Sequence, residues 1–188
     1  MIQTRYIAKS PEDLPDIEAT LARSGLEFMQ DVRDGKLAGP PIGALMGFWP
    51  TLVEEGKTVF TGTPEFSTTN PMGTVHGGWY GTILDSCMAC AVMTRVPKGS
   101  DYTTLEFKVN ILRPIPLGTE VEAIGTCQHA GRSTGIANGE IRGVSDGKLY
   151  ATGSTTCIIM KMKLAIAPRL IKQCPVYECL QLGAIAVT

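Results

Sequence analysis

The chain has 188 residues, a formal net charge of −1, and a composition that is 44% hydrophobic and 19% charged. This composition is typical of a globular protein and excludes disordered and fibrous classes, and the length fits one domain. Lysines and arginines are scattered, so we expect no nucleic-acid partner. The sequence shows no signal segment and no uncharged stretch long enough to span a bilayer, so we expect a cytoplasmic protein without a membrane partner.

Residues 1–38 are expected to form an N-terminal helical extension. Within it, residues 14–32 carry apolar side chains at helical spacing, between a Ser-Pro-Glu-Asp start signal and an Asp-Gly-Lys stop signal. After a passage rich in glycine and proline, residues 44–49 are a candidate first strand. Residues 58–66, rich in Thr, Val and Phe, are predicted to form a second strand.

A long helix is predicted for residues 76–94, where apolar side chains cover almost every face at helical spacing. A helix that is apolar all round must be buried. Cys87 and Cys90 lie inside this pattern. Because the chain has only two histidines, we favour core packing of these thiols over a redox or metal site.

More strands are predicted after this helix. Residues 105–111 alternate between apolar and polar side chains, as a strand with one inward face does. Three further strands are expected at 120–128, 134–144 and 148–162, which gives a meander of about four antiparallel strands. One curved sheet wrapped around a single buried helix is the α+β arrangement known as the hotdog fold.

The loop before the long helix could carry chemistry. It reads Thr-Asn-Pro-Met-Gly-Thr-Val-His-Gly-Gly from Thr69, and Gly77 and Gly78 occupy the first helical positions. Glycine lets another molecule approach the backbone closely, and the free N–H groups of a helix start can polarise a carbonyl or hold an oxyanion. A structural alternative stays open, because such glycines also permit tight packing and His76 could simply cap the helix.

Asp85 is the only charged side chain between His76 and Arg95. A carboxylate on an otherwise apolar helix is costly to bury unless it is paired, so it is expected to be paired, at an edge, or functional. Burial would raise its pKa, which suits a general base or nucleophile.

Gly77 and Asp85 are eight residues apart, which is about 12 Å of rise along a helix. A polarising donor and an attacking group must both lie about 3 Å from one reacting carbonyl. If both residues serve one reaction, we therefore expect the helix start and the aspartate to come from different subunits, on antiparallel helices at a two-fold interface.

The spacing of several motifs resembles the PaaI-like (phenylacetic-acid-degradation-type) hotdog thioesterases. The matching features are Asn-Pro-x-Gly-x-x-His-Gly-Gly from Asn70, the acid nine residues after His76, and Arg113-Pro114 at the end of a strand. Later matches are His-Ala-Gly-Arg ending at Arg132 and the Asp-Gly hairpin at residues 146–147. The resemblance covers residues 44–160. We place the thioesterase domain at residues 39–162 and assign no role to the tail at 163–188.

The resemblance implies hydrolysis of acyl-CoA thioesters without metal or cofactor, in a homodimer commonly paired into a homotetramer. Gly77 N–H would polarise the carbonyl, and Asp85 of the partner subunit would act as nucleophile or general base. Asn70 would position water or the carboxylate, and His76 would bind near the thioester. Thr104, with Thr103 as its neighbour, would assist.

Substrate contacts are expected from Gly78, from Trp79 as a pocket wall, and from Arg132 near the CoA phosphates. Trp79 could equally be core, together with Tyr80, Ile83 and Met88.

Two alternatives remain at this point. Hotdog hydratases and dehydratases pair a catalytic histidine with an acid, which His76 and Asp85 match nominally. A non-catalytic acyl-CoA-binding module is the other alternative. The sequence leaves the acyl group open.

Overall fold

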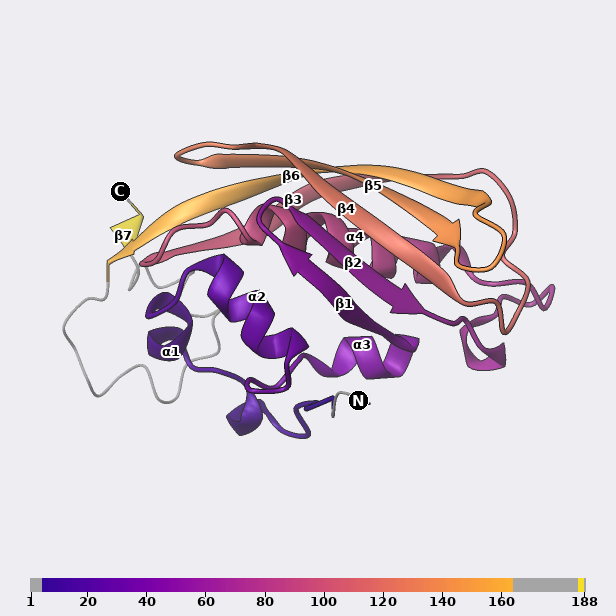
Figure 1. Ribbon diagram of the computed structural model, residues 1–188, viewed down its shortest axis with the longest axis horizontal. Coiled ribbons are helices and arrows are strands. Elements are labelled where there is room, and N and C mark those ends of the chain that lie inside the picture. Colours follow the sequence, from indigo (N-terminus) through magenta and orange to yellow (C-terminus); the bar gives the residue numbers. More distant parts are fainter. Residues whose placement is uncertain (1–4, 164–185, 188) are drawn as a thin grey trace.

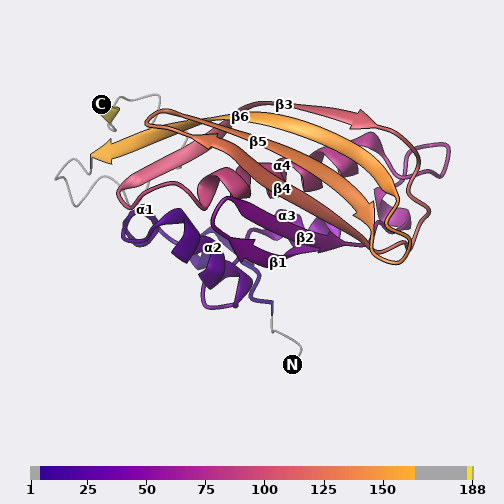
Figure 2. The same ribbon diagram turned by 45° about the horizontal axis from the view of Figure 1, so that its top comes forward.

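The computed structural model describes residues 5–163 and 186–187. At its centre lies helix α4 (Gly77–Met93), and a curved antiparallel sheet wraps over it (Figures 1 and 2). The strands of the sheet are β1 (Phe48–Glu54), β2 (Lys57–Gly62), β3 (Ser100–Ile111), β4 (Val121–Ala130), β5 (Thr134–Gly143), β6 (Leu149–Lys163) and β7 (Ala186–Val187). They are ordered β1-β2-β4-β5-β6-β3, and β7 pairs with β6. The expected α+β hotdog fold is confirmed.

Helix α4 forms the core because its sequence is apolar on all sides. Ile83, Leu84, Cys87, Met88 and Val92 are all 0% exposed. Each large apolar side chain buried in this way contributes about 1.5–3 kcal/mol. The predicted helix at 76–94 is confirmed to within one residue at each end.

Glycines on the inner face of the sheet set its distance from α4. A Cβ atom on Gly125 of β4 would collide with the backbone carbonyl of Cys87, and one on Gly135 of β5 would collide with Val92. Nearby, Thr58 Oγ1 of β2 donates a 2.7 Å hydrogen bond to Cys87 O. The sheet therefore packs directly against the helix backbone at this point.

The order of the strands differs in one respect from the expectation. β4, β5 and β6 form an antiparallel meander, but β3 pairs with β6 instead of β4. The expected four-stranded meander is therefore wrong, because residues 112–120 carry the chain across the sheet before β4 begins. β3 lies at one end of the sheet order, and β1 lies at the other.

β3 contains a β-bulge, where the register with β6 shifts between Thr104 and Glu106. Tyr102 and Thr104 face the helix before the bulge, and Phe107 and Ile111 face it afterwards. Leu105, which the alternating pattern places on the inward face, is instead 62% exposed. A bulge inserts one residue and so reverses the alternation of side chains.

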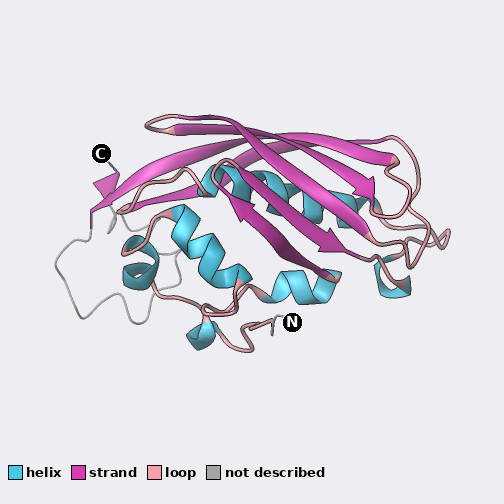
Figure 3. Cartoon of the chain, viewed as in Figure 1, coloured by secondary structure: helices cyan, strands magenta, loops and turns pink. Residues whose placement is uncertain are grey.

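The N-terminal part contains the 3-10 helix η1 (Pro11–Asp13) and helices α1 (Ile17–Leu21), α2 (Gly25–Arg33) and α3 (Pro41–Met46). The expected single helix at 14–32 is thus two helices, because Ser24 and Glu27 form a capping box that starts α2. In Figure 3, α2 and α3 lie beside β1, and α2 also packs against the end of α4.

The expected strand at 44–49 is wrong. Pro41 occupies a first-turn position of α3, and Gly47 ends this helix with φ of 73°, so β1 begins only at Phe48. The second strand ends at Gly62 and is followed by the 3-10 helix η2 (Phe66–Thr68). Apart from Lys163 and β7, the tail lies outside the described residues. None of the described helices is both long and apolar enough to cross a membrane.

We predict that Gly125→Ala lowers the free energy of unfolding by about 1–3 kcal/mol, because the added methyl group must push β4 away from the Cys87 carbonyl. Urea denaturation measures the change. Thr126→Ala at the neighbouring exposed position is the control and should have a much smaller effect. Equal effects of the two substitutions would contradict close packing at Gly125.

Candidate active site

The start of α4 offers a free backbone donor. His76 is the N-cap residue, and its Nδ1 accepts a 2.8 Å hydrogen bond from Gly78 N–H. Its ring proton therefore lies on Nε2 in the neutral form. Trp79 N–H donates to His76 O, whereas the N–H of exposed Gly77 has no acceptor among the described residues. The Gly77 N–H, at the positive end of the helix dipole, is thus available to a ligand oxygen.

Asn70 shapes the loop that leads into this helix start. Its Oδ1 accepts hydrogen bonds from Met72 N at 2.9 Å and Thr74 N at 3.2 Å. Its Nδ2 donates to Thr74 Oγ1 at 2.8 Å. Within one subunit the Asn70 amide is therefore engaged by its own loop, and its expected role toward water or a carboxylate stays a prediction.

Asp85 lies on the side of α4 that faces the bulge of β3. Thr104 Oγ1 donates a 3.0 Å hydrogen bond to Asp85 Oδ1, so these two expected residues are brought together. Burial raises the pKa of Asp85, and the Thr104 hydrogen bond offsets only part of this effect. No described lysine, arginine or histidine forms an ion pair with it. Asp85 is thus a half-buried carboxylate without a compensating cation, and Thr103 is exposed on the other face of β3.

The two groups of candidate residues do not meet within one subunit. Gly77 and Asp85 belong to the same continuous helix, so about 12 Å of helix rise separates them. Asn70, His76 and Gly77 lie at its start, and Asp85 and Thr104 lie near its middle. One carbonyl cannot contact both sets of the same chain.

Trp79 forms part of a hollow beside the helix start. Its side chain is 1% exposed, and its Nε1 donates a 2.8 Å hydrogen bond to Met46 O. The hollow has a volume of about 370 Å³, and His76, Gly78 and Leu45 also line it. Tyr80, Ile83 and Met88, which could have lined a pocket, are buried in the core instead.

Arg132 lies far from the helix start of its own subunit. It is exposed in the turn between β4 and β5, and the first residues of β5 pack against Val92 near the end of α4. A contact between Arg132 and a ligand held at Gly77 of the same chain is therefore excluded by the length of α4.

Of the two spaced cysteines, Cys87 is buried in the core and Cys90 is partly buried. Burial raises the pKa of Cys87 well above its ordinary value and that of Cys90 to about 12, so both thiols are protonated at neutral pH. This agrees with core packing. Among residues 5–163, no group of three histidine, cysteine or acidic side chains is arranged to hold a metal ion.

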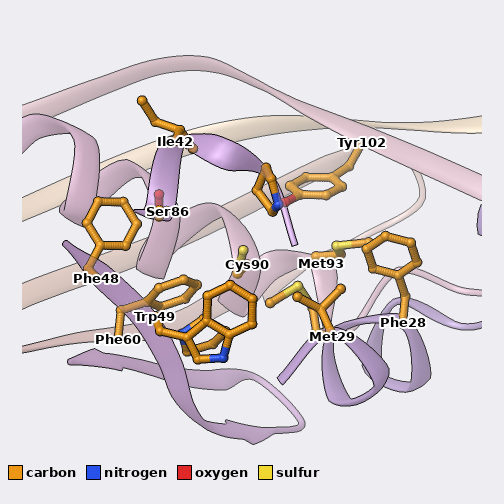
Figure 4. Close-up of a pocket in the computed structure, with 14 residues that line it drawn as sticks. Phe28, Met29, Ile42, Phe48, Trp49, Phe60, Ser86, Cys90, Met93 and Tyr102 are labelled. Atoms are coloured by element: carbon orange, nitrogen blue, oxygen red, sulfur yellow. The ribbon is translucent and has the colours of Figure 1, made fainter. Parts of the chain in front are cut away.

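Sequence reasoning missed an apolar cavity between the N-terminal helices and α4 (Figure 4). Ser86 and Tyr102 belong to its lining, and each lies within two residues of a predicted site residue in the sequence. That proximity was the available signal. The sequence contains no signal for the contribution of α2 and α3 to this cavity, because that contribution depends on how the N-terminal helices dock.

Comparisons with known proteins show which proteins this chain is similar to. Residues 72–150 match the family model described as Thioesterase superfamily. A Caenorhabditis elegans protein whose name provisionally calls it an esterase is 32% identical over 108 residues, or 57% of this chain and 63% of that protein. Mouse acyl-coenzyme A thioesterase 13 is 27% identical over 88 residues, or 47% of this chain and 62% of that protein. The chain thus matches less than two thirds of the length of either relative.

The fold has counterparts among solved structures. A point mutant of the phenylacetic acid degradation protein PaaI from Thermus thermophilus is similar with a TM-score of 0.57 and 27% sequence identity. The similarity covers 63% of this chain and 97% of that one. The part of the chain outside this match includes segments that PaaI lacks.

We predict that Asp85→Asn raises the melting temperature at pH 7. The pKa of Asp85 is higher in the folded chain than in the unfolded chain, so ionisation above the unfolded value of about 3.9 disfavours folding. The gain should disappear as the pH falls below that value, where both states are protonated.

Thermal melts from about pH 3 to pH 8, on both sides of the unfolded pKa, measure this effect. Asp146→Asn is the control of opposite sign, because hydrogen bonds from Lys148 lower the pKa of Asp146. A loss of stability for Asp85→Asn at pH 7 would contradict an uncompensated carboxylate.

Proposed function

We propose, from the match of residues 72–150 to the thioesterase superfamily model, that the protein hydrolyses acyl-CoA thioesters to a free acid and CoA. The observation that carries the proposal is the half-buried carboxylate of Asp85, hydrogen-bonded by Thr104 and without a cation. The similarity to a protein named acyl-coenzyme A thioesterase supports CoA as the thiol. A carboxylate that is not used for stability is a candidate for chemistry.

In this mechanism the thioester carbonyl accepts a hydrogen bond from Gly77 N–H. This donor and the dipole of α4 stabilise the negative charge that develops on the oxygen. Asp85 acts in its ionised form, either by taking a proton from the attacking water or by attacking the carbonyl carbon itself. In both cases the C–S bond breaks, CoA leaves as a thiolate that takes up a proton, and water supplies the oxygen of the free acid.

The site requires two subunits. If two α4 helices run antiparallel and cross at Gly81, residue 77 of one lies opposite residue 85 of the other. β3 suits such an interface because it ends the sheet order and exposes Leu105, Phe107 and Ile111 to 62%, 46% and 48%. We therefore propose a homodimer with two shared sites. Pairing of dimers into a homotetramer is the further expectation from the family.

The remaining residues then have distinct parts. His76 presents Nε2–H to the substrate, while its Nδ1 holds Gly78 N–H. Since Nδ1 is occupied, His76 could act as a base only by giving up the helix cap, which disfavours the hydratase alternative. Trp79 forms the floor of the hollow beside Gly78. Arg132 of the subunit that supplies Asp85 would lie toward the loop of its partner, where CoA phosphates could reach it. We propose the cytoplasm as the site of action.

We predict that Asp85→Asn lowers kcat/KM for acyl-CoA hydrolysis by about 10²–10⁴-fold, because the substituted side chain can neither accept a proton nor attack. Thiol release over a panel of aryl, short, medium and long acyl-CoAs measures it. Asp101→Asn is the matched control, since Asp101 lies on the same strand as Thr104 and burial also raises its pKa. It should keep near-wild-type activity.

Three outcomes would contradict the proposal. If Asp85→Asn hydrolyses as fast as the wild type, the catalytic assignment is wrong. If the wild type binds acyl-CoA without turnover, the binding-module alternative gains. If an enoyl-CoA loses its chromophore without releasing thiol, the protein is a hydratase.

We predict that Gly77→Pro inactivates the homodimer by removing the N–H donor, with about 10²–10³-fold loss of kcat. Proline is well tolerated at the first helical position, and His76 already has the extended backbone, ψ of 140°, that a following proline requires. Gly77→Ala keeps the N–H and should lose much less activity.

Mixed dimers test whether the site is shared. Gly77→Pro and Asp85→Asn chains, each inactive, should regain activity when refolded together, because one of the two sites then contains both intact residues. No recovery, with mixed dimers demonstrated by differently tagged chains, would exclude a site shared in this way.

A further inference from the structure

An apolar cavity of about 210 Å³ lies between the N-terminal helices and the hotdog core (Figure 4). Phe28 and Met29 of α2 and Ile42 of α3 form the wall from the N-terminal side. Trp49 of β1 forms another wall. Helix α2 lies outside residues 72–150, the part of the chain that matches the thioesterase family model.

The opposite wall comes from the elements that hold Asp85. Ser86 and Cys90 of α4 and Tyr102 of β3 line the cavity, and all three are labelled in Figure 4. Ser86 follows Asp85 directly, and Tyr102 shares the inward face of β3 with Thr104. The cavity is therefore lined by sequence neighbours of both members of the Asp85–Thr104 pair.

The cavity is suited to an apolar occupant. The Ser86 hydroxyl donates a 2.8 Å hydrogen bond to Thr82 O, so this polar group is already engaged. Among the described side chains, the Trp49 indole N–H is the buried polar group without a hydrogen-bond partner. Hydrocarbon bound here would lose no hydrogen bonds and would gain the free energy of apolar burial.

We propose that this cavity is the acyl pocket of the subunit that supplies Asp85, and that the preferred acyl group is apolar with about six or more carbon atoms. A dry apolar cavity of roughly 150 Å³ is large enough for benzene. At about 210 Å³, this one holds a ring or a chain of that size with room to spare, whereas an acetyl group would leave most of it empty. The inference rests on the proposed thioester hydrolysis at Asp85.

Three neighbouring positions on helix α3 allow substitutions that distinguish this pocket from other surfaces. Ile42 is 38% exposed and lines the cavity. Leu45 is 73% exposed and lines the hollow beside His76 and Gly78 instead. Ala44 is exposed and lines neither. Because all three side chains are solvent-accessible, a tryptophan at each should leave the fold intact.

The experiment compares Ile42→Trp, Ala44→Trp and Leu45→Trp in the full chain, with kcat/KM measured for acetyl-, butanoyl-, hexanoyl-, octanoyl- and phenylacetyl-CoA. Ile42→Trp should lower kcat/KM for the three larger acyl groups at least tenfold relative to acetyl-CoA. Ala44→Trp should keep the wild-type ratio. Phe28→Ala should shift the preference in the opposite direction, toward octanoyl-CoA. Loss of stability alone would lower kcat/KM for all substrates together and could not produce opposite shifts in substrate preference.

A change of ratio with Leu45→Trp and none with Ile42→Trp would overturn the proposal and place the acyl group beside the helix start. Unchanged ratios in all variants would overturn it as well, while hydrolysis itself would still support the proposed function. Calorimetric binding of an S-octyl-CoA thioether separates the proposed hydrolysis from the proposed pocket. If the wild type binds this analogue without hydrolysing any thioester, the proposed function fails. In that case, binding of the analogue that is tenfold weaker to Ile42→Trp than to the wild type supports the pocket, and equal binding to both overturns the pocket.

Discussion

The structure depends on the burial of α4. A helix that is apolar on every face cannot face water, so the sheet must curve around it and approach its backbone closely. Gly125 makes that approach possible, and the Thr58 hydrogen bond to Cys87 O fixes it. Because the helix is held along most of its length, its N-terminal donor and its single carboxylate occupy fixed positions in the subunit.

The cover over α4 is incomplete where the candidate chemistry lies. On the side of β3, half-exposed Phe107 and Ile111 are the neighbours of Gly81 and Gly77, and Asp85 is only partly buried. A partner chain that covers this side would bury apolar surface and enclose the carboxylate at the same time. Assembly and a drier catalytic site would thus follow from one contact, and lower polarity around Asp85 would raise its pKa further.

Features encoded by local sequence could be predicted, and those that depend on distant contacts could not. The bounds of α4 follow from its continuous apolar pattern and from His76 as its cap. The apolar run at 44–49 is ambiguous by itself, and the signals that decide it are Pro41 and Gly47, which start and end a short helix. The pairing of β3 with β6 has no local signal. Asp85 is singled out by its charge, but its hydrogen bond to Thr104 depends on how β3 docks, so only the family resemblance indicated it.

The bulge at Leu105 divides β3 into two halves of opposite pleat. The first half carries Tyr102 and Thr104, which surround Asp85 and the cavity, and the second carries Phe107 and Ile111 along the open edge. The inserted residue separates the two alternation patterns, so a substitution in one half does not alter which side chains the other half turns inward. If the proposed acyl pocket and the proposed dimer both use β3, substrate preference and subunit pairing could therefore change independently on a single strand during divergence.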